Sequence, residues 1–233
     1  MEASMKRTLW SLQAAAFAAL VAGPALSQGA PMQLPKGGPA AGAINKAAPP
    51  PKAVNLDGGA QVQRANAWFN ANATMTADFA QIGPSGKRTE GQLYVSRPGK
   101  LRFSYDNPAT TDIIADGTSI AIRDRKTAKQ ELAYIWQTPL KFLLKDKIDL
   151  ARDTKVIDVS ESPAGVAIVI EDNATMGGGV SRIKLIFDQK NFALKQWVVK
   201  DPQGYETTVS LANLDFKTKP DPDLFKINME RFN

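Results

Sequence analysis

Four of the carboxylates between residues 106 and 131 come closest to a catalytic arrangement in this chain. They are Asp106, Asp112, Asp116 and Glu131. Two of them could act as the acid and base of a glycosidase, but nothing in their spacing selects a pair. The 233 residues include no His and no Cys, which excludes Ser-His-Asp triads, imidazole bases, thiolate nucleophiles, zinc knuckles and iron–sulfur ligands. Ordinary surface charge explains the four carboxylates, so the sequence favours neither an enzyme nor a metal or organic cofactor.

The first 27 residues have the layout of a secretory signal peptide. Lys6 and Arg7 give a positive start, an apolar run covers residues 9–22, and small residues precede a cleavage site before Gln28. The alternative is a membrane anchor, but the run is shorter than the roughly 20 apolar residues of a spanning helix. We therefore expect cleavage and export of a soluble protein. A chain without cysteine needs no disulfide-forming step, which is compatible with the bacterial periplasm.

The composition divides the rest of the chain into two parts. Residues 28–56 are dominated by Pro, Ala and Gly without a hydrophobic period, which predicts a flexible linker. Residues 57–233 hold the patterned segments and are expected to form one domain. Without residues 1–27 the chain has 27 Lys and Arg against 22 Asp and Glu, a net charge of +5. These charges are scattered and not gathered with aromatic residues, so the pattern does not favour a nucleic-acid-binding protein.

Short segments with period-two alternation dominate the domain. Leu101, Phe103 and Tyr105 alternate with polar neighbours, and turn clusters such as Arg97-Pro98-Gly99-Lys100 separate successive segments. About eleven strands are expected, at 77–81, 92–95, 101–105, 111–115, 120–122, 132–136, 156–159, 166–171, 182–188, 194–200 and 205–214. This pattern predicts one large antiparallel sheet, strongly curved or nearly closed into a barrel, with a two-layer sandwich as the alternative.

Two short helices interrupt the strand pattern. Val62, Ala65 and Phe69 fall on one face at helical spacing. The pair Thr138-Pro139 is a usual cap and first turn, and an apolar stripe follows in residues 140–144. Helices of two or three turns would cover the concave face of a curved sheet incompletely or movably, so that face could hold apolar cargo. An ordinary packed core is the alternative, and composition does not separate the two.

Several segments, in this order along the chain, resemble one known family. They are 77–81 (ADFAQ), 90–103 (EGQLYVSRPGKLRF), 116–117 (DG), 138–140 (TPL) and 221–225 (DPDLF). The most specific is the motif G-x-L-x-V-x-R-P-x-x-x-R-F, present from Gly91 to Phe103. Over about residues 60–228 the chain is similar to the LolA family, the periplasmic carriers of outer-membrane lipoproteins.

The resemblance implies a fold and a function. The fold would be an unclosed β-barrel whose apolar concave face is covered by a helical lid. The protein would take outer-membrane lipoproteins from an inner-membrane ABC transporter of the LolCDE type, shield their acyl chains and pass them to a LolB-type outer-membrane acceptor. LolB shares the fold but carries a lipid anchor on a cysteine. This chain has none, which favours the soluble carrier, expected as a monomer without a cofactor or covalent chemistry.

The resemblance also implies site residues. In the family the arginine of the R-P pair, here Arg97, hydrogen-bonds to the lid and helps keep the empty cavity closed. A surface arginine before a turn proline is the alternative. Leu101 occupies a position where the family has an apolar cavity residue, although a core strand residue is nearly as good an explanation. The candidates for the cavity wall and lid are Phe79, Leu101, Phe103, Leu140, Phe142, Leu143 and Leu144.

Two other non-enzymatic functions remain open at this point. The same fold could carry or sense another lipid or hydrophobic ligand, and identifying extracted bound material would distinguish this from a lipoprotein carrier. The chain could also be a structural interaction module, which would neither exchange lipid nor have a lipid-accessible cavity.

Overall fold

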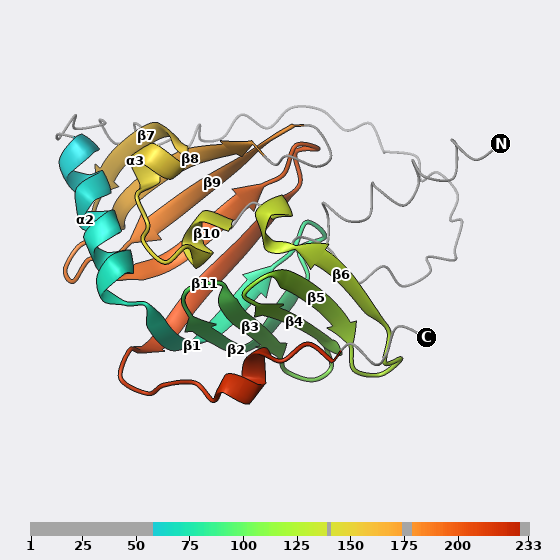
Figure 1. Cartoon of the computed structure of the whole chain (residues 1–233). Helices are drawn as coiled ribbons and strands as arrows, with labels where there is room; N and C mark the ends of the chain where they lie inside the picture. Colours follow the sequence, from blue (N-terminus) through green and yellow to red (C-terminus); the bar gives the residue numbers. More distant parts are fainter. Residues whose placement is uncertain (1–57, 139–140, 174–178, 229–233) are drawn as a thin grey trace, which may run out of the picture.

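One curved antiparallel sheet makes up most of the protein (Figure 1). The structure is a computed structural model that describes residues 58–138, 141–173 and 179–228. The strands are β1 (Thr74–Ile82), β2 (Arg88–Ser96), β3 (Lys100–Tyr105), β4 (Thr111–Asp116), β5 (Ser119–Asp124), β6 (Gln130–Tyr134), β7 (Lys155–Ser162), β8 (Gly165–Asn173), β9 (Val180–Phe187), β10 (Leu194–Lys200) and β11 (Glu206–Asp215). The predicted signal peptide (1–27) and linker (28–56) lie outside the described residues.

The strand order explains where the sheet ends and how its edges are connected. Across the sheet the order is β6-β5-β4-β3-β2-β1-β11-β10-β9-β8-β7, so β6 and β7 are the two edges. This confirms the predicted mainly β fold, with eleven strands in one sheet that is not closed into a barrel, and the sandwich alternative is wrong. Because β6 and β7 are consecutive in the chain, the connection between them must cross from one edge to the other.

That connection, which we call the crossing segment, comprises the described residues 135–138 and 141–154. It contains the 3-10 helices η2 (Ile135–Gln137) and η3 (Lys141–Leu144) and the single α-helical turn α3 (Leu150–Asp153). Figure 1 shows it passing over the concave face of the sheet, with helix α2 (Gly58–Ala71) alongside. In the described part of the chain, the concave face is therefore covered by α2 and the short helical turns of the crossing segment, and not by a second sheet.

Alternation along the strands directs the apolar side chains to the concave face. In β3, Leu101, Phe103 and Tyr105 are buried while the residues between them are partly exposed. In β8, Val166, Ile168 and Ile170 follow the same rule. Side chains of successive residues point to opposite faces of a strand, so the period-two pattern translates directly into one buried face.

The N-terminal helix follows its prediction closely. Val62, Ala65 and Phe69 are buried, as their helical spacing indicated. The rings of Trp68 and Phe69 meet the ring of Phe187 in β9 edge to face, with centroid distances of 6.0 and 5.8 Å. These aromatic contacts fix α2 against the β7–β9 end of the sheet.

The crossing segment differs from its prediction in two ways. Thr138 does not begin a helix of two or three turns: it follows η2, its backbone N–H donates to Ile135 O at 3.0 Å, and η3 is only four residues long. Trp136 was expected on a strand, but β6 ends at Tyr134 and Trp136 lies in η2. The rings of Tyr134 and Trp136 stack with their centroids 5.9 Å apart. About half of each residue is exposed, so neither side chain faces the core.

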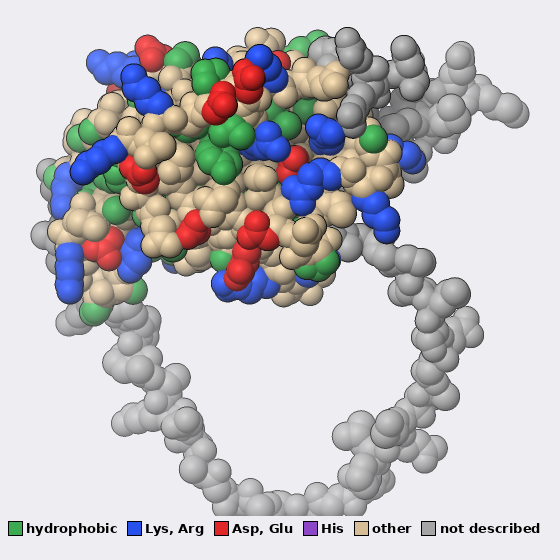
Figure 2. All heavy atoms as spheres, turned by 90° about the horizontal axis from the view of Figure 1, so that it is seen from below, with side chains coloured by type: hydrophobic (Ala, Val, Ile, Leu, Met, Phe, Trp, Pro, Cys, Tyr) green, Lys and Arg blue, Asp and Glu red, His purple; other side chains and the backbone are tan. Residues whose placement is uncertain are grey.

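The outer surface carries a mixture of charges. On the face shown in Figure 2, basic and acidic side chains lie interspersed with apolar ones, as the scattered charges of the sequence indicated. Among the described residues, no helix is both long enough and apolar enough to cross a membrane.

A buried carboxylate joins three elements on the convex side. Asp112 in β4 is 2% exposed, and its two oxygens accept from Arg102 at 3.0 Å and from Arg125 at 2.6 Å. Arg102 also donates to Leu224 O in η4 (Pro222–Phe225), which fastens the C-terminal turn to the sheet. A charge buried in this way is favourable only while its partners remain in place.

Replacing Asp112 with Ala is expected to lower the free energy of unfolding by about 3 kcal/mol, because it leaves two partly buried arginines without their carboxylate. The measurement is urea unfolding, in which the variant should have a lower midpoint concentration of urea than the parent protein. Glu90→Ala is the matched control, since Glu90 pairs with Arg88 at an exposed site and its loss should change stability by about 0.5 kcal/mol at most. Equal midpoints for the two variants would contradict the anchoring role.

Candidate functional site

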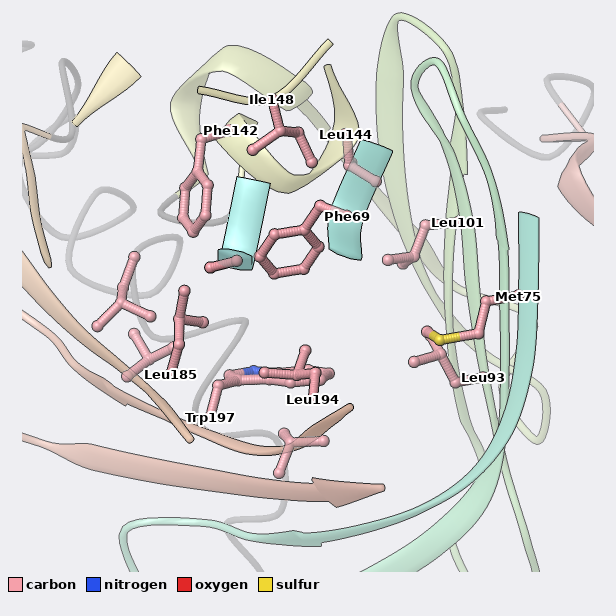
Figure 3. Close-up of a cluster of buried hydrophobic side chains, with 14 of the residues drawn as sticks. Phe69, Met75, Leu93, Leu101, Phe142, Leu144, Ile148, Leu185, Leu194 and Trp197 are labelled. Carbon is pink, nitrogen blue, oxygen red and sulfur yellow. The ribbon is translucent and has the colours of Figure 1, made fainter. Parts of the chain in front are cut away.

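An apolar cavity lies beneath the crossing segment. It is lined by Trp68, Phe69, Asn72, Met75, Leu93, Val95, Arg97, Leu101, Leu143, Leu144, Leu194 and Trp197. Figure 3 shows Phe69 of α2 between the crossing segment and Trp197 of the sheet, with Leu101, Met75 and Leu93 on the facing strands. Its volume is about 50 Å³, enough for a few water molecules and too little for a long acyl chain. In this conformation the space beneath the crossing segment is therefore nearly filled by its lining side chains.

A β-bulge brings two of the lining side chains together. The pairing of β10 with β9 shifts register between Leu194 and Gln196, so one extra residue is inserted at Lys195. Leu194 and Trp197 are three residues apart, yet both are buried on the concave face. Without the bulge, strict alternation would place them on opposite faces.

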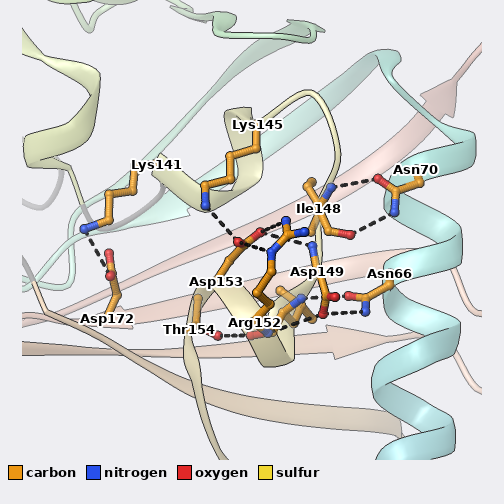
Figure 4. Close-up of polar contacts among 11 residues, drawn as sticks. Asn66, Asn70, Lys141, Lys145, Ile148, Asp149, Arg152, Asp153, Thr154 and Asp172 are labelled. Carbon is orange, nitrogen blue, oxygen red and sulfur yellow. Dashed lines mark hydrogen bonds and ion pairs between the residues drawn. The ribbon is translucent and has the colours of Figure 1, made fainter.

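Two asparagines of α2 hold the crossing segment by its backbone (Figure 4). Asn70 donates to Ile148 O at 2.8 Å and accepts from Ile148 N at 2.9 Å. Asn66 accepts from Leu150 N at 2.9 Å and donates to the Asp149 carboxylate at 3.4 Å. These bonds satisfy backbone groups that have no strand partner, and they join α2 and the segment around residues 148–150 into one unit.

Ion pairs at Asp153 hold the same unit from the other side. Asp153 accepts from Lys145 at 2.8 Å and from Arg152 at 3.1 Å, and its side chain is 4% exposed. Burial pushes its pKa upward, but the hydrogen bonds from Arg152 and Lys145 outweigh burial and bring the pKa down to about 2. The carboxylate therefore stays ionised, and the pairs stay formed, through the neutral and mildly acidic range.

Arg97 links the sheet to both covering elements. It stands at the turn between β2 and β3, and its guanidinium donates to Lys145 O at 3.1 Å, to Asp146 O at 3.2 Å and to Phe69 O. Phe69 lies in the last turn of α2, and its carbonyl also accepts from Asn72 N at 3.2 Å. The carbonyl end of a helix carries partial negative charge, which attracts a cation. Burial lowers the pKa of Arg97 and the Asp146 carboxylate opposes this, so the side chain stays charged at neutral pH.

The turn that carries Arg97 is itself tightly built. Gly99 donates its backbone N–H to Leu144 O at 2.7 Å, which adds a direct link from the turn to η3. Its φ is +74°, and a Cβ there would lie 2.5 Å from the Gly117 Cα. Only glycine fits that conformation and that approach, so the turn places Arg97 at a fixed position beside η3.

The structure separates the predicted site residues into three groups. Arg97, Leu101, Leu143 and Leu144 line the cavity. Phe79, Phe103 and Phe142 are 1–3% exposed and belong to the surrounding core; Phe79 and Phe103 pack edge to face at 5.0 Å, and Phe103 reaches Trp197 at 6.4 Å. Leu140 lies outside the described residues.

Other cavity residues were not predicted as such. Trp68, Met75, Leu93, Val95, Leu194 and Trp197 line it without having been named. Met75, Leu93 and Val95 share the period-two pattern of the strands, which could have identified them as inward-facing. No sequence signal showed the bulge that places Leu194 beside Trp197.

The four carboxylates considered for catalysis do not form a pair. Both oxygens of Asp112 are occupied by arginines. Asp116 accepts from the backbone N–H groups of Thr118 and Ser119, each at 2.9 Å, and so shapes the turn between β4 and β5. Asp106 and Glu131 are exposed. The geometry of these groups supports a structural role for Asp112 and Asp116.

The family described as "Outer membrane lipoprotein carrier protein LolA" matches residues 70–228. An outer-membrane lipoprotein carrier protein of Legionella pneumophila (strain Lens) is 30% identical over 169 residues, covering 69% of this chain and 81% of the relative. That of strain Paris is 31% identical over 167 residues, covering 68% and 80%. A LolA superfamily protein of Nitrosomonas europaea has a solved structure with a TM-score of 0.41 and 10% identity, covering 74% of this chain and 98% of that one.

The family match extends from the end of α2 to the end of the described chain. It includes every strand of the sheet, the crossing segment and the turn that carries Arg97. The resemblance inferred from the motif around Arg97 is thereby confirmed. The chain belongs to the LolA family of outer membrane lipoprotein carrier proteins.

Proposed function

We propose that the protein shields the acyl chains of lipoproteins and carries them across the periplasm. It receives them from a LolCDE-type ABC transporter in the inner membrane and gives them to a LolB-type acceptor at the outer membrane. The observation that carries this proposal is an apolar cavity beneath the crossing segment, which polar hydrogen bonds hold in place, in a chain of the LolA family. In this proposal residues 1–27 are the signal peptide that directs export, and residues 28–56 are a linker ahead of the carrier domain. The carrier works as a soluble monomer.

The closed cavity supports a mechanism in which the crossing segment acts as a lid. Each acyl CH₂ removed from water gains about 0.8 kcal/mol, so an open apolar cavity would hold several chains very tightly. A cavity of about 50 Å³ admits none of them until the lid moves. Cargo then binds only the open fraction of molecules, and closure lowers the apparent affinity enough for release.

Depleting the protein from its host tests the proposal as a whole. A reporter lipoprotein destined for the outer membrane should remain in the inner membrane, because its acyl chains have no route through water. Membrane fractionation measures the distribution, and re-expression of the parent protein should restore it. Normal delivery in depleted cells would refute the carrier function.

Leu143→Asn should weaken binding of acylated cargo about tenfold, since it replaces an apolar lid residue at the cavity with an amide. Leu101→Asn should do the same from the sheet. The measurement is titration of the purified protein with a fluorescent fatty-acid analogue, with circular dichroism to check that the β fold persists. Leu132→Asn is the matched control, because Leu132 is also half-buried but does not line the cavity. Equal affinities for all three variants would contradict the cavity assignment.

Arg97→Leu should still load cargo but transfer it poorly. Charge-assisted hydrogen bonds are worth about 1.5–3 kcal/mol, so removing those that hold the lid should favour the open form and tighten apparent affinity by roughly one to two decades. Arg97→Lys should retain transfer only in part, because an ammonium group lacks the planar fork of donors of a guanidinium group. The assay compares loading from the inner membrane with transfer to the acceptor.

Arg88→Leu serves as the control for this experiment. Arg88 is the first residue of β2, the strand that ends just before Arg97. It is exposed and pairs only with Glu90 among the described ion pairs, so its loss should leave both steps unchanged. Transfer by Arg97→Leu at the parental rate would show that Arg97 is not a latch.

A further inference from the structure

Two polar side chains interrupt the apolar concave face near the lid. Along β8, Asp172 continues the inward series of Val166, Ile168 and Ile170. Its register partner on β9, Ser181, continues the inward series that includes Ile183. Asp172 is 5% and Ser181 1% exposed, so both are as buried as the apolar residues beside them.

Each of these side chains has unused hydrogen-bonding capacity. Within the described part of the chain, neither Asp172 Oδ2 nor Ser181 Oγ has a hydrogen-bond partner. A buried polar group without a partner costs free energy, and native proteins contain few of them. Valine or isoleucine would continue both strands at lower cost, so the two polar positions require another explanation.

One lysine of the lid contacts Asp172 of this pair. Lys141, the first residue of η3, approaches Asp172 Oδ1 at 3.2 Å and donates to Asn173 O at 3.2 Å. Figure 4 shows Lys141 reaching Asp172 from the same turn that leads to Lys145. Phe142 and Leu144 of that turn are buried against the core. A movement of η3 that opens the cavity would therefore also withdraw Lys141 from Asp172, the register partner of Ser181, at the end of the apolar face.

We propose that Asp172 and Ser181 form a polar subsite for the head of the acylated cargo, an inference that rests on the proposed carrier function. An ionised carboxylate only accepts hydrogen bonds, whereas a hydroxyl both donates and accepts. The complementary ligand presents N–H donors and carbonyl acceptors directly beside its acyl chains. Acylated peptide has this chemistry, because ester and amide groups join the chains to the first peptide N–H groups. A lipid without N–H donors leaves the carboxylate unsatisfied.

Two probes separate this subsite from the apolar cavity. One is a synthetic peptide with a diacylated N-terminal cysteine, and the other is methyl palmitate, which has an ester carbonyl but no N–H. Both are measured by displacement of a fluorescent fatty-acid analogue, and the selectivity is the ratio of the two affinities. Asp172→Asn also loosens the contact with Lys141 and eases lid opening. Opening multiplies both affinities by the same factor, so the ratio reports the subsite alone.

Asp172→Asn should lower the selectivity for acylated peptide about tenfold, and Ser181→Ala about fivefold. Ser181→Ala should also leave thermal stability unchanged or raise it, because it removes a buried hydroxyl that has no partner. Glu171→Gln is the matched control: Glu171 is the neighbouring carboxylate of β8 but pairs with Arg182 and Lys155 on the other face. Its selectivity should equal that of the parent.

The outcomes distinguish the subsite from the carrier function. If the parent binds both probes and the selectivity of Asp172→Asn and Ser181→Ala is unchanged, the subsite is refuted while the apolar carrier stands. A parent that binds neither probe refutes the carrier function and the subsite with it. A large loss of thermal stability in Ser181→Ala would assign the hydroxyl a structural role and overturn its part in the proposal.

Discussion

The structure depends on a sheet whose two edges are consecutive in the chain. Because β6 and β7 lie at opposite ends of the strand order, the crossing segment has to span the concave face. Most of that segment has no strand partner, so its buried backbone groups need other partners. Asn66 and Asn70 supply them from α2 and Arg97 supplies them from the β2–β3 turn. The topology thus creates both the cavity and the need for polar side chains around it that hydrogen-bond to the crossing segment.

Two kinds of contact hold the crossing segment, and together they would suit the reversible closure proposed above. Apolar side chains such as Leu144 give most of the closing free energy but no direction, since burial of apolar area is not directional. The bonds from Arg97 and Asn70 fix where the crossing segment rests, and in the proposed mechanism water would replace each of them as the segment lifts. A net gain of about 1 kcal/mol for a bond from Asn70, and about 1.5–3 kcal/mol for one from the charged Arg97, is enough to define one closed position without making it permanent.

The local hydrophobic pattern of the sequence was sufficient to predict the strands of the sheet, but it was insufficient to predict some of the cavity residues. Alternation identified all eleven strands, and the motif around Arg97 identified the turn beside the lid. The period-two run through Trp136 failed because alternation does not show where pairing stops, and β6 ends two residues earlier. Leu194 was missed because a bulge changes the face without changing composition. Phe79 and Phe103 point inward as expected, but which inward residues meet a cavity depends on how the lid packs.

An apolar cavity alone selects cargo poorly, because every acyl chain gains about the same free energy per CH₂. Selectivity requires directional groups, and on the concave face of β8 and β9 these are Asp172 and Ser181. In the closed form Lys141 occupies one oxygen of Asp172. The oxygen proposed to bind the cargo head is the other one, Oδ2, which has no partner in the described part of the chain. Closure of the lid would return the Lys141 charge to Oδ1, so the carboxylate would attract the cargo head less strongly as the protein closes and cargo leaves.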